Sequence, residues 1–366
     1  MRILLIGEYS NVHWTLAQGL RTLGHEVTVL SNGDFWKDYP RDINLRRVPT
    51  HFGGIRYLLR LYSLLPHLKG YDVVQIINPM FLEVKAERIW AIYHYLRRHN
   101  GNVFLGAYGM DSYWVKSCIE AKPLRYSDFN IGSTLRTNAD ALKDRKEWIG
   151  TEKEKLNQFI AEDCDGIIAG LYEYYVSYHP CFPHKTTFIP YPIKLPSTDP
   201  VIKDHYDSCN VFIGINKSRN EYKGTDIMLK AAQDVQERFP QKMTLTIAES
   251  VPFQEYQHLM EGSDVILDQL YSYTPAMNSL LAMSKGIIVI GGGEPENYEI
   301  LHESELRPII NVQPTYQSVY HALEELVLNL DRIPLLKRQS VEYIRRHHEY
   351  TKVARQYEAF YINRKS

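Results

Sequence analysis

The sequence has few cysteines and lacks any long apolar run. Its four cysteines show neither metal-ligand spacing nor a paired framework, which argues against a zinc or disulfide scaffold and indicates a reducing compartment. No segment approaches the roughly 18 uninterrupted apolar residues of a spanning helix. The apolar run at the start, within "MRILLIGEYSN", is too short for a signal peptide and is explained as a first strand. We therefore expect a cytoplasmic protein.

A strong net charge and a dinucleotide fingerprint are also missing. The formal net charge is −1 over 366 residues, so nothing global directs the chain to nucleic acid. The loop after the first strand lacks G-x-G-x-x-G, which disfavours a nicotinamide oxidoreductase. The only metal-like pattern, "DCD" at 163–165, precedes a strand and is better explained by charge at a helix end. We predict neither a metal nor a cofactor.

Short apolar runs alternate with helical patterns along the whole chain. Nearly continuous apolar strands separated by helices predict parallel sheets covered on both faces. A proline-rich stretch, "IPYPIKLPSTDP" at 189–200, interrupts the alternation and is interpreted as a linker. We predict an α/β protein with two doubly wound, Rossmann-like domains facing a cleft. They cover 1–195 and 201–345, and a last helix at 349–366 packs back on the first.

Two turns of the predicted N-terminal domain follow strands and carry polar groups. After the first strand, "IGEYSNVHWTL" contains Gly7 and, in the first turn of the next helix, His13. The alternative for His13 is a helix-capping loop with a partly buried histidine. In "AYGMDSYW", Asp111 either caps a helix or meets a substrate hydroxyl at the strand end.

The first loop of the predicted C-terminal domain is basic. "INKSRNEYKGTD" holds Lys217, Arg219 and Lys223 after a strand, and a helix opens at Gly224-Thr225. Cations beside a helix N-terminus favour an anion such as phosphate. The alternative is a solvated charged loop.

A second pair of loops in this domain combines a helix start with glycines and acids. In "SYTPAMNSLLAMSKG", Thr274-Pro275 is typical of a helix start and places free N–H groups near Asn278 and Ser279. In "GGGEPENYEIL", Gly292 and Gly293 permit close approach of a ligand. Glu294 and Glu296 either favour the helix dipole or accept hydrogen bonds from sugar hydroxyls. A nucleotide-diphosphate sugar would satisfy both the basic and the acidic loops.

The predicted C-terminal domain resembles the donor domain of group 1, glycogen-synthase-like, retaining glycosyltransferases, which have the GT-B fold. The resemblance rests on the order of a basic loop ending in Lys223-Gly224, "SDVILDQ", "LLAMSKGIIVI" and "GGGEPENYE". The N-terminal domain is similar only in its layout. The resemblance implies sugar transfer from a nucleotide-sugar, usually with retention and without a required metal.

The resemblance also implies roles for single residues. Arg219 and Lys223 would hold the diphosphate, and the Pro295-Glu296 turn would line the sugar side with Gly292 and Gly293. His13 and Asp111 would face the acceptor and the reacting carbon. One departure concerns a pair of glutamates eight positions apart, which the family commonly has. In this sequence Tyr273 and Leu281 occupy those positions.

The acceptor side is expected to involve a glycan or a lipid-linked glycan, in bacterial-type surface polysaccharide biosynthesis. Residues 54–70 form a basic, aromatic, amphipathic segment that predicts peripheral contact with an anionic membrane, at the inner face of the plasma membrane. The alternative is an ordinary helix covering the sheet. Two alternatives to a transferase are a sugar-nucleotide epimerase and a non-catalytic binding module, the latter favoured by Tyr273 and Leu281.

Overall fold

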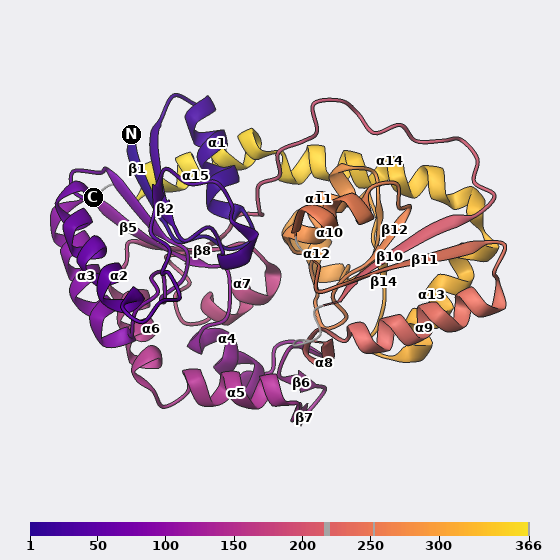
Figure 1. Ribbon diagram of the computed structural model, residues 1–366, viewed down its shortest axis with the longest axis horizontal. Helices are drawn as coiled ribbons and strands as arrows, with labels where there is room; N and C mark the ends of the chain where they lie inside the picture. Colours follow the sequence, from indigo (N-terminus) through magenta and orange to yellow (C-terminus); the bar gives the residue numbers. More distant parts are fainter. Residues whose placement is uncertain (216–219, 252, 365–366) are drawn as a thin grey trace. The chain divides into compact units, whose positions relative to one another are not determined.

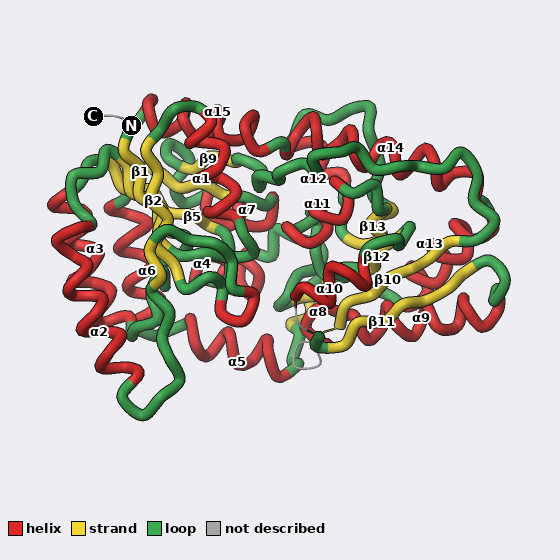
Figure 2. Tube along the Cα trace, turned by 45° about the horizontal axis from the view of Figure 1, so that its top comes forward, coloured by secondary structure: helices red, strands yellow, loops and turns green. Residues whose placement is uncertain are grey.

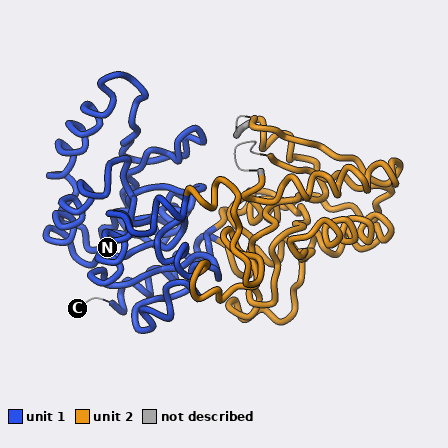
Figure 3. Tube along the Cα trace, turned by 90° about the horizontal axis from the view of Figure 1, so that it is seen from below, with its two compact units in different colours: residues 1–117, 144–192, 350–366 blue, residues 118–143, 193–349 orange. Residues whose placement is uncertain are grey.

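The computed structural model describes residues 1–215, 220–251 and 253–364, with the side chains of Asn220, Phe253 and Gln254 left out. The chain divides into two compact units, coloured separately in Figure 3. Unit 1 comprises residues 1–117, 144–192 and 350–366. Unit 2 comprises residues 118–143 and 193–349.

Unit 1 contains a seven-stranded parallel sheet in the order β3-β2-β1-β4-β5-β8-β9. Its central strands are almost entirely buried, as expected for a parallel sheet covered on both faces. The strands are β1 (Arg2–Ile6), β2 (Glu26–Ser31), β3 (Ile43–Asn44), β4 (Val73–Ile76), β5 (Asn102–Ala107), β8 (Gly166–Ala169) and β9 (Thr186–Phe188).

Helices connect these strands, and the last helix of the chain joins them. α15 lies beside α1, where Gly19 allows close contact because a Cβ there would lie 2.4 Å from the Tyr350 carbonyl oxygen (Figure 1). The helices of unit 1 are α1 (Val12–Thr22), η1 (Phe35–Lys37), α2 (Gly53–Leu64), η2 (Leu65–His67), α3 (Ala86–His99), α4 (Ser112–Lys116), α6 (Glu152–Asp163), α7 (Tyr172–Tyr178) and α15 (Tyr350–Asn363).

Unit 2 contains a five-stranded parallel sheet in the order β11-β10-β12-β13-β14. A loop without helix or strand joins β9 to this sheet and includes the proline-rich stretch (Figure 2). The strands are β10 (Cys209–Ile215), β11 (Met243–Glu249), β12 (Val265–Leu267), β13 (Ile288–Gly291) and β14 (Ile310–Asn311).

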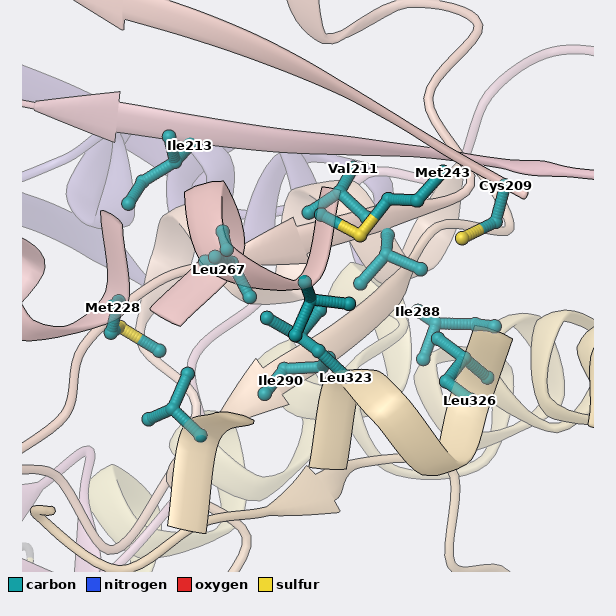
Figure 4. Packing of buried hydrophobic residues seen from close by; sticks show 14 of the residues in the cluster. Cys209, Val211, Ile213, Met228, Met243, Leu267, Ile288, Ile290, Leu323 and Leu326 are labelled. Carbon is teal, nitrogen blue, oxygen red and sulfur yellow. The ribbon is translucent and has the colours of Figure 1, made fainter. Parts of the chain in front are cut away.

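The core of unit 2 lies between this sheet and its helices. Apolar side chains of β10, β12 and β13 meet those of α9 and α13, among them Met228 and Leu323 (Figure 4). The helices of unit 2 are α8 (Asn220–Lys223), α9 (Thr225–Arg238), α10 (Phe253–Met260), α11 (Met277–Ser284), α12 (Pro295–Ile300), α13 (Tyr316–Leu328), η5 (Leu330–Arg332), α14 (Ile333–Tyr343) and η6 (Ile344–His348).

Residues 118–143 belong to unit 2, although the sequence analysis includes them in the domain 1–195. They contain a small antiparallel hairpin, β6 (Asn130–Ile131) and β7 (Thr134–Leu135). No apolar strand or long helix occurs in this segment, so its sequence pattern does not reveal which core it joins. Two elements run across the unit boundaries, η3 (Ser117–Ala121) and α5 (Ala139–Trp148).

Candidate functional site

Each sheet has a point at which its strand order reverses, and ligands of open α/β sheets bind there beyond the carboxyl ends of the strands. In unit 1 this point lies between β1 and β4, and in unit 2 between β10 and β12. The loop after β10 contains Lys217 and Arg219, which lie outside the described residues. Their predicted role in phosphate binding stays a prediction.

Gly7 and His13 lie at the reversal point of unit 1. Gly7 has a φ of +88°, and a Cβ there would lie 2.2 Å from the Ile77 side chain, so glycine is required by both conformation and space. His13 is fully buried, with Nδ1 2.8 Å from the Gly7 carbonyl oxygen and Nε2 3.0 Å from the Gln75 amide nitrogen. The Gln75 amide donates to Nε2, so the ring proton resides on Nδ1.

Burial lowers the pKa of His13 to about 3, which keeps the ring neutral at physiological pH. Gln75 continues the network by donating to the Tyr108 hydroxyl at 3.2 Å and accepting from Tyr361 of α15 at 2.5 Å. These contacts explain His13 as a structural residue that links α1, β4 and α15. Its catalytic role stays a prediction.

Glu8 is a buried acid that the sequence analysis missed. Its two carboxyl oxygens accept the N–H groups of His13 at 3.2 Å and Trp14 at 2.9 Å, both at the start of α1. Burial raises its pKa to about 8, against the lowering effect of these hydrogen bonds. Glu8 also lines a cavity of about 150 Å³ together with Tyr57 and Phe81. Its position in the loop that follows β1 is the signal that could have identified it.

Asp111 caps α4, which agrees with the first of the two interpretations given for this residue, that of a helix cap. Its carboxylate accepts the Trp114 N–H at 2.9 Å and the Tyr178 hydroxyl at 2.8 Å, and the side chain is fully buried. Burial raises its pKa to about 6 despite both hydrogen bonds. The carboxylate therefore has a complete structural role, and its contact with substrate stays a prediction.

Lys223 ends α8 and precedes Gly224, which takes φ +71° at the start of α9. The Lys223 carbonyl accepts the N–H of Leu270 at 3.0 Å, which joins the loop after β10 to the loop after β12. A Cβ at Gly224 would lie 2.8 Å from Leu270, so glycine allows this junction. The side chain of Lys223 is half-buried at the reversal point of unit 2.

Asn278 and Ser279 lie in the first turn of α11, and both side chains are engaged within unit 2. Asn278 donates to the Tyr256 hydroxyl at 2.7 Å, and Ser279 donates to the Asp268 carboxylate. The helix begins at Met277 with Ala276 at the N-cap, so the helix start predicted at Thr274-Pro275 is wrong. The Thr274 carbonyl instead accepts the Ser272 hydroxyl at 2.6 Å in an irregular turn.

The glycine turn after β13 packs against its own unit. A Cβ at Gly292 would lie 2.2 Å from the Ser272 carbonyl oxygen, so glycine is required here by a neighbouring loop. The N–H of Gly293 donates to the Asn311 side chain at 3.1 Å, and the N–H of Glu294 donates to the Tyr273 carbonyl at 3.1 Å. Ligand contact at these glycines stays a prediction.

Glu294 and Glu296 come together around an arginine from the segment 118–143. Arg125 Nη2 lies 2.7 Å from Glu294 Oε2, and its Nη1 lies 2.6 Å from Glu296 Oε1. Its backbone N–H donates to the Tyr273 hydroxyl at 2.6 Å, and its guanidinium lies 4.9 Å from the Tyr273 ring. The ionised partners raise the pKa of Arg125 above its usual value, led by the hydrogen bond to Glu296.

We call these residues the Arg125 cluster: Arg125, Tyr126, Tyr273, Glu294 and Glu296. Tyr126 completes it by donating to Glu294 Oε1 at 2.5 Å, with its ring 4.9 Å from that of Tyr273. The two acids and Tyr273 stand out in the sequence, whereas Arg125 and Tyr126 do not. No motif surrounds them in "KPLRYSDFN", so only the folded chain shows their association with the acids.

Within the described ranges, no group of three or more His, Cys, Asp or Glu side chains is placed to hold a metal ion. The acids of "DCD", Asp163 and Asp165, instead form ion pairs with Arg97. Among the helices of the described chain, none combines the length and apolarity needed to cross a membrane.

No protein-family model matches the sequence, and no curated protein matches it. Solved structures do match over the full chain. Sucrose-phosphate synthase from Thermosynechococcus elongatus aligns with a TM-score of 0.64 and 13% identity, covering 99% of this chain and 98% of that one. The catalytic domain of starch synthase IV from Arabidopsis thaliana, bound to ADP and acarbose, aligns with a TM-score of 0.62 and 12% identity. The alignment covers 100% of this chain and 99% of that one.

Anabaena HepE in complex with UDP-glucose gives a TM-score of 0.61 at 10% identity, covering 98% of each chain. Each of the three similarities covers nearly the whole chain and therefore includes both units. At these identities the likeness concerns architecture. The predicted fold class is confirmed: the chain is an α/β protein with two Rossmann-like parallel sheets and has the GT-B fold.

Proposed function

We propose that this protein transfers a sugar from a nucleotide-diphosphate sugar to a glycan or lipid-linked acceptor in surface polysaccharide biosynthesis. The observation that carries the proposal is the full-length likeness to a synthase of sucrose phosphate, a starch synthase holding ADP, and a protein holding UDP-glucose. The basic loop and the acid-bearing turn, both in unit 2, supply the groups that such a donor requires.

The proposed mechanism is electrostatic and independent of metal or cofactor, with retention at the anomeric carbon. Lys217, Arg219 and Lys223, with the N-terminus of α9, stabilise the diphosphate as it leaves. His13 and Asp111 belong to the acceptor side in this proposal. Their burial means that they act on substrate only by shaping the loops after β1 and β5.

A thermal-shift screen across nucleoside diphosphates and their sugars tests the donor assignment, because ligand binding raises the melting temperature by mass action. Lys223→Ala is expected to lower kcat/KM for the matching donor about 100-fold, as removal of a charge-stabilising group does. Lys230→Ala is the matched control, because Lys230 is exposed on α9 and pairs with Asp234. Equal kinetics of Lys223→Ala and the control would contradict the assignment.

A non-catalytic binding module is the second candidate, favoured by Tyr273 and Leu281 in the places of the family's glutamates. Hydrolysis or transfer of donor sugar by the purified chain would exclude it. NMR of the sugar released from donor alone separates an epimerase from a transferase, since an epimerase yields a changed sugar without any acceptor.

We also propose peripheral contact with an anionic membrane, at the inner face of the plasma membrane, through residues 54–70. In α2, Ile55, Leu59 and Tyr62 are 59%, 67% and 48% exposed, beside exposed Arg56 and Arg60. Such a mixed apolar and basic face suits an interface of lipid headgroups.

Co-sedimentation with vesicles of anionic and of neutral lipid tests the contact. We expect Leu59→Glu to abolish pelleting with anionic vesicles. Leu335→Glu is the control, since Leu335 is a leucine of α14 that is 57% exposed. Equal pelleting of the wild-type protein with both lipids would refute the proposal.

A further inference from the structure

Glu294 is buried, and both of its carboxylate oxygens accept hydrogen bonds within its own unit, which limits what it can do for a ligand. The side chain is 4% exposed, and Oε1 accepts from Tyr126 at 2.5 Å and from Gln313 at 2.7 Å. Oε2 accepts from Arg125 at 2.7 Å. Burial alone would raise the pKa of Glu294, but these hydrogen bonds and the charge of Arg125 lower it, so the group stays ionised. Glu294 therefore holds Arg125.

Arg125 is the member of the cluster that is exposed. Its side chain is 54% exposed, and that of Glu296 is 20% exposed. Tyr273 does not replace the missing glutamate as an acceptor for ligand, because the residue is only 1% exposed and its hydroxyl faces the Arg125 N–H. The accessible polar edge of this turn consequently combines a guanidinium with the carboxylate of Glu296.

The segment 118–143 holds Arg125 in place by further contacts that do not involve the two glutamates. Arg136 donates to the Glu221 carbonyl at 2.6 Å, and its guanidinium lies 3.6 Å from the Tyr271 ring. Tyr222 donates to the Asp128 carboxylate at 2.7 Å. These contacts join the segment 118–143 to α8 and to the loop after β12. Arg125 is therefore preorganised at the acid-bearing turn by the fold of unit 2.

A donor and an acceptor side by side match the chemistry of neighbouring sugar hydroxyls, because each hydroxyl both donates and accepts. The three charges of Arg125, Glu294 and Glu296 sum to −1, which opposes a ligand carrying a carboxylate. We propose that Arg125, paired with Glu296, determines donor specificity by binding hydroxyls of an uncharged sugar, while the net negative charge of the cluster excludes carboxylated sugars. This inference rests on the proposed function.

Calorimetric titration of the full chain with UDP, UDP-glucose and UDP-glucuronate, and with the ADP and GDP analogues, tests the inference. Wild-type protein is expected to bind the glucose donor at least about tenfold more tightly than the glucuronate donor. Arg125→Ala is expected to weaken binding of the glucose donor about tenfold, the scale of a hydrogen bond to a charged group, and to leave binding of the nucleoside diphosphate within about twofold. Lys122→Ala removes a cation from the same segment and serves as control.

The outcomes separate the two proposals. If the wild-type protein binds none of the nucleoside diphosphates, the proposed function fails and the inference fails with it. If it binds glucose and glucuronate donors equally, the inference alone is overturned, without need of any variant. Unchanged or tighter binding of the glucose donor by Arg125→Ala also overturns it, since Arg125 would then be inert or obstructive.

Discussion

At the scale of single residues, two buried ionisable groups of unit 1 make stability depend on pH in opposite ways. The pKa of His13 is lowered to about 3, so His13 lowers the free energy of unfolding as pH falls below its ordinary value of 6.5. The pKa of Glu8 is raised from 4.5 to about 8, so its contribution is fully present at low pH and is lost as pH rises through 8. Above pH 6.5, Glu8 is the one of these two groups whose contribution to the free energy of unfolding still changes with pH.

We predict that Glu8→Gln removes this dependence of the free energy of unfolding on pH. Between pH 6.5 and 8 the free energy of unfolding of the wild-type protein should fall by about 2 kcal/mol relative to the variant. Urea unfolding at several pH values measures the difference. A constant offset is expected as well, because glutamine can accept only one of the N–H groups of His13 and Trp14. Curves that stay parallel across this range would show that Glu8 does not titrate there.

At the scale of elements, the contact between α1 and α15 depends on a glycine inside a helix. Glycine normally weakens a helix, yet a Cβ at Gly19 would lie 2.4 Å from the Tyr350 carbonyl oxygen and 2.8 Å from the Ala354 Cβ. The nearest atom belongs to the backbone, so relief requires movement of α15. No local pattern in the sequence marks Gly19 as the point of contact.

Gly19→Ala should therefore destabilise the protein by about 1–3 kcal/mol, the cost of overpacking, despite alanine's better helix propensity. Gly54→Ala in α2 is the matched control. Its Cβ would meet only the end of the Arg47 side chain, at 3.3 Å, so we expect a neutral or slightly stabilising change. Chemical denaturation of both variants checks the pair, and equal effects would disprove a tight α1–α15 contact.

At the scale of the whole chain, the core of unit 1 is completed by a helix that comes last in the sequence. Val353, Ala354, Tyr357 and Tyr361 of α15 are fully buried. The hydroxyls of Tyr357 and Tyr361 bond to Tyr108 and Gln75, each at 2.5 Å. Without α15, unit 1 would expose an apolar face and leave buried polar groups unpaired.

A chain ending at residue 349 should accordingly lose the cooperative melting of unit 1 and gain sensitivity to protease within residues 1–117. Melting by circular dichroism and limited proteolysis measure the two effects. Gln356→Ala, on the exposed side of α15, should behave like the wild-type protein. A truncated chain with an unchanged melting profile would show that the cores of the two sheets fold cooperatively without α15.

The strands and their parallel pairing could be predicted from the sequence alone, because apolar runs such as those of β1 and β13 and the helices between them are local patterns. The GT-B fold is expected from the resemblance of the C-terminal domain to a known family. Lys217 and Arg219 also stand out locally, and their roles stay predictions. The association of Arg125 with Glu294 could not be predicted, since the two residues lie 169 positions apart. Such a contact depends on how the tertiary fold brings distant segments of the chain together. No spacing or composition near either residue predicts it.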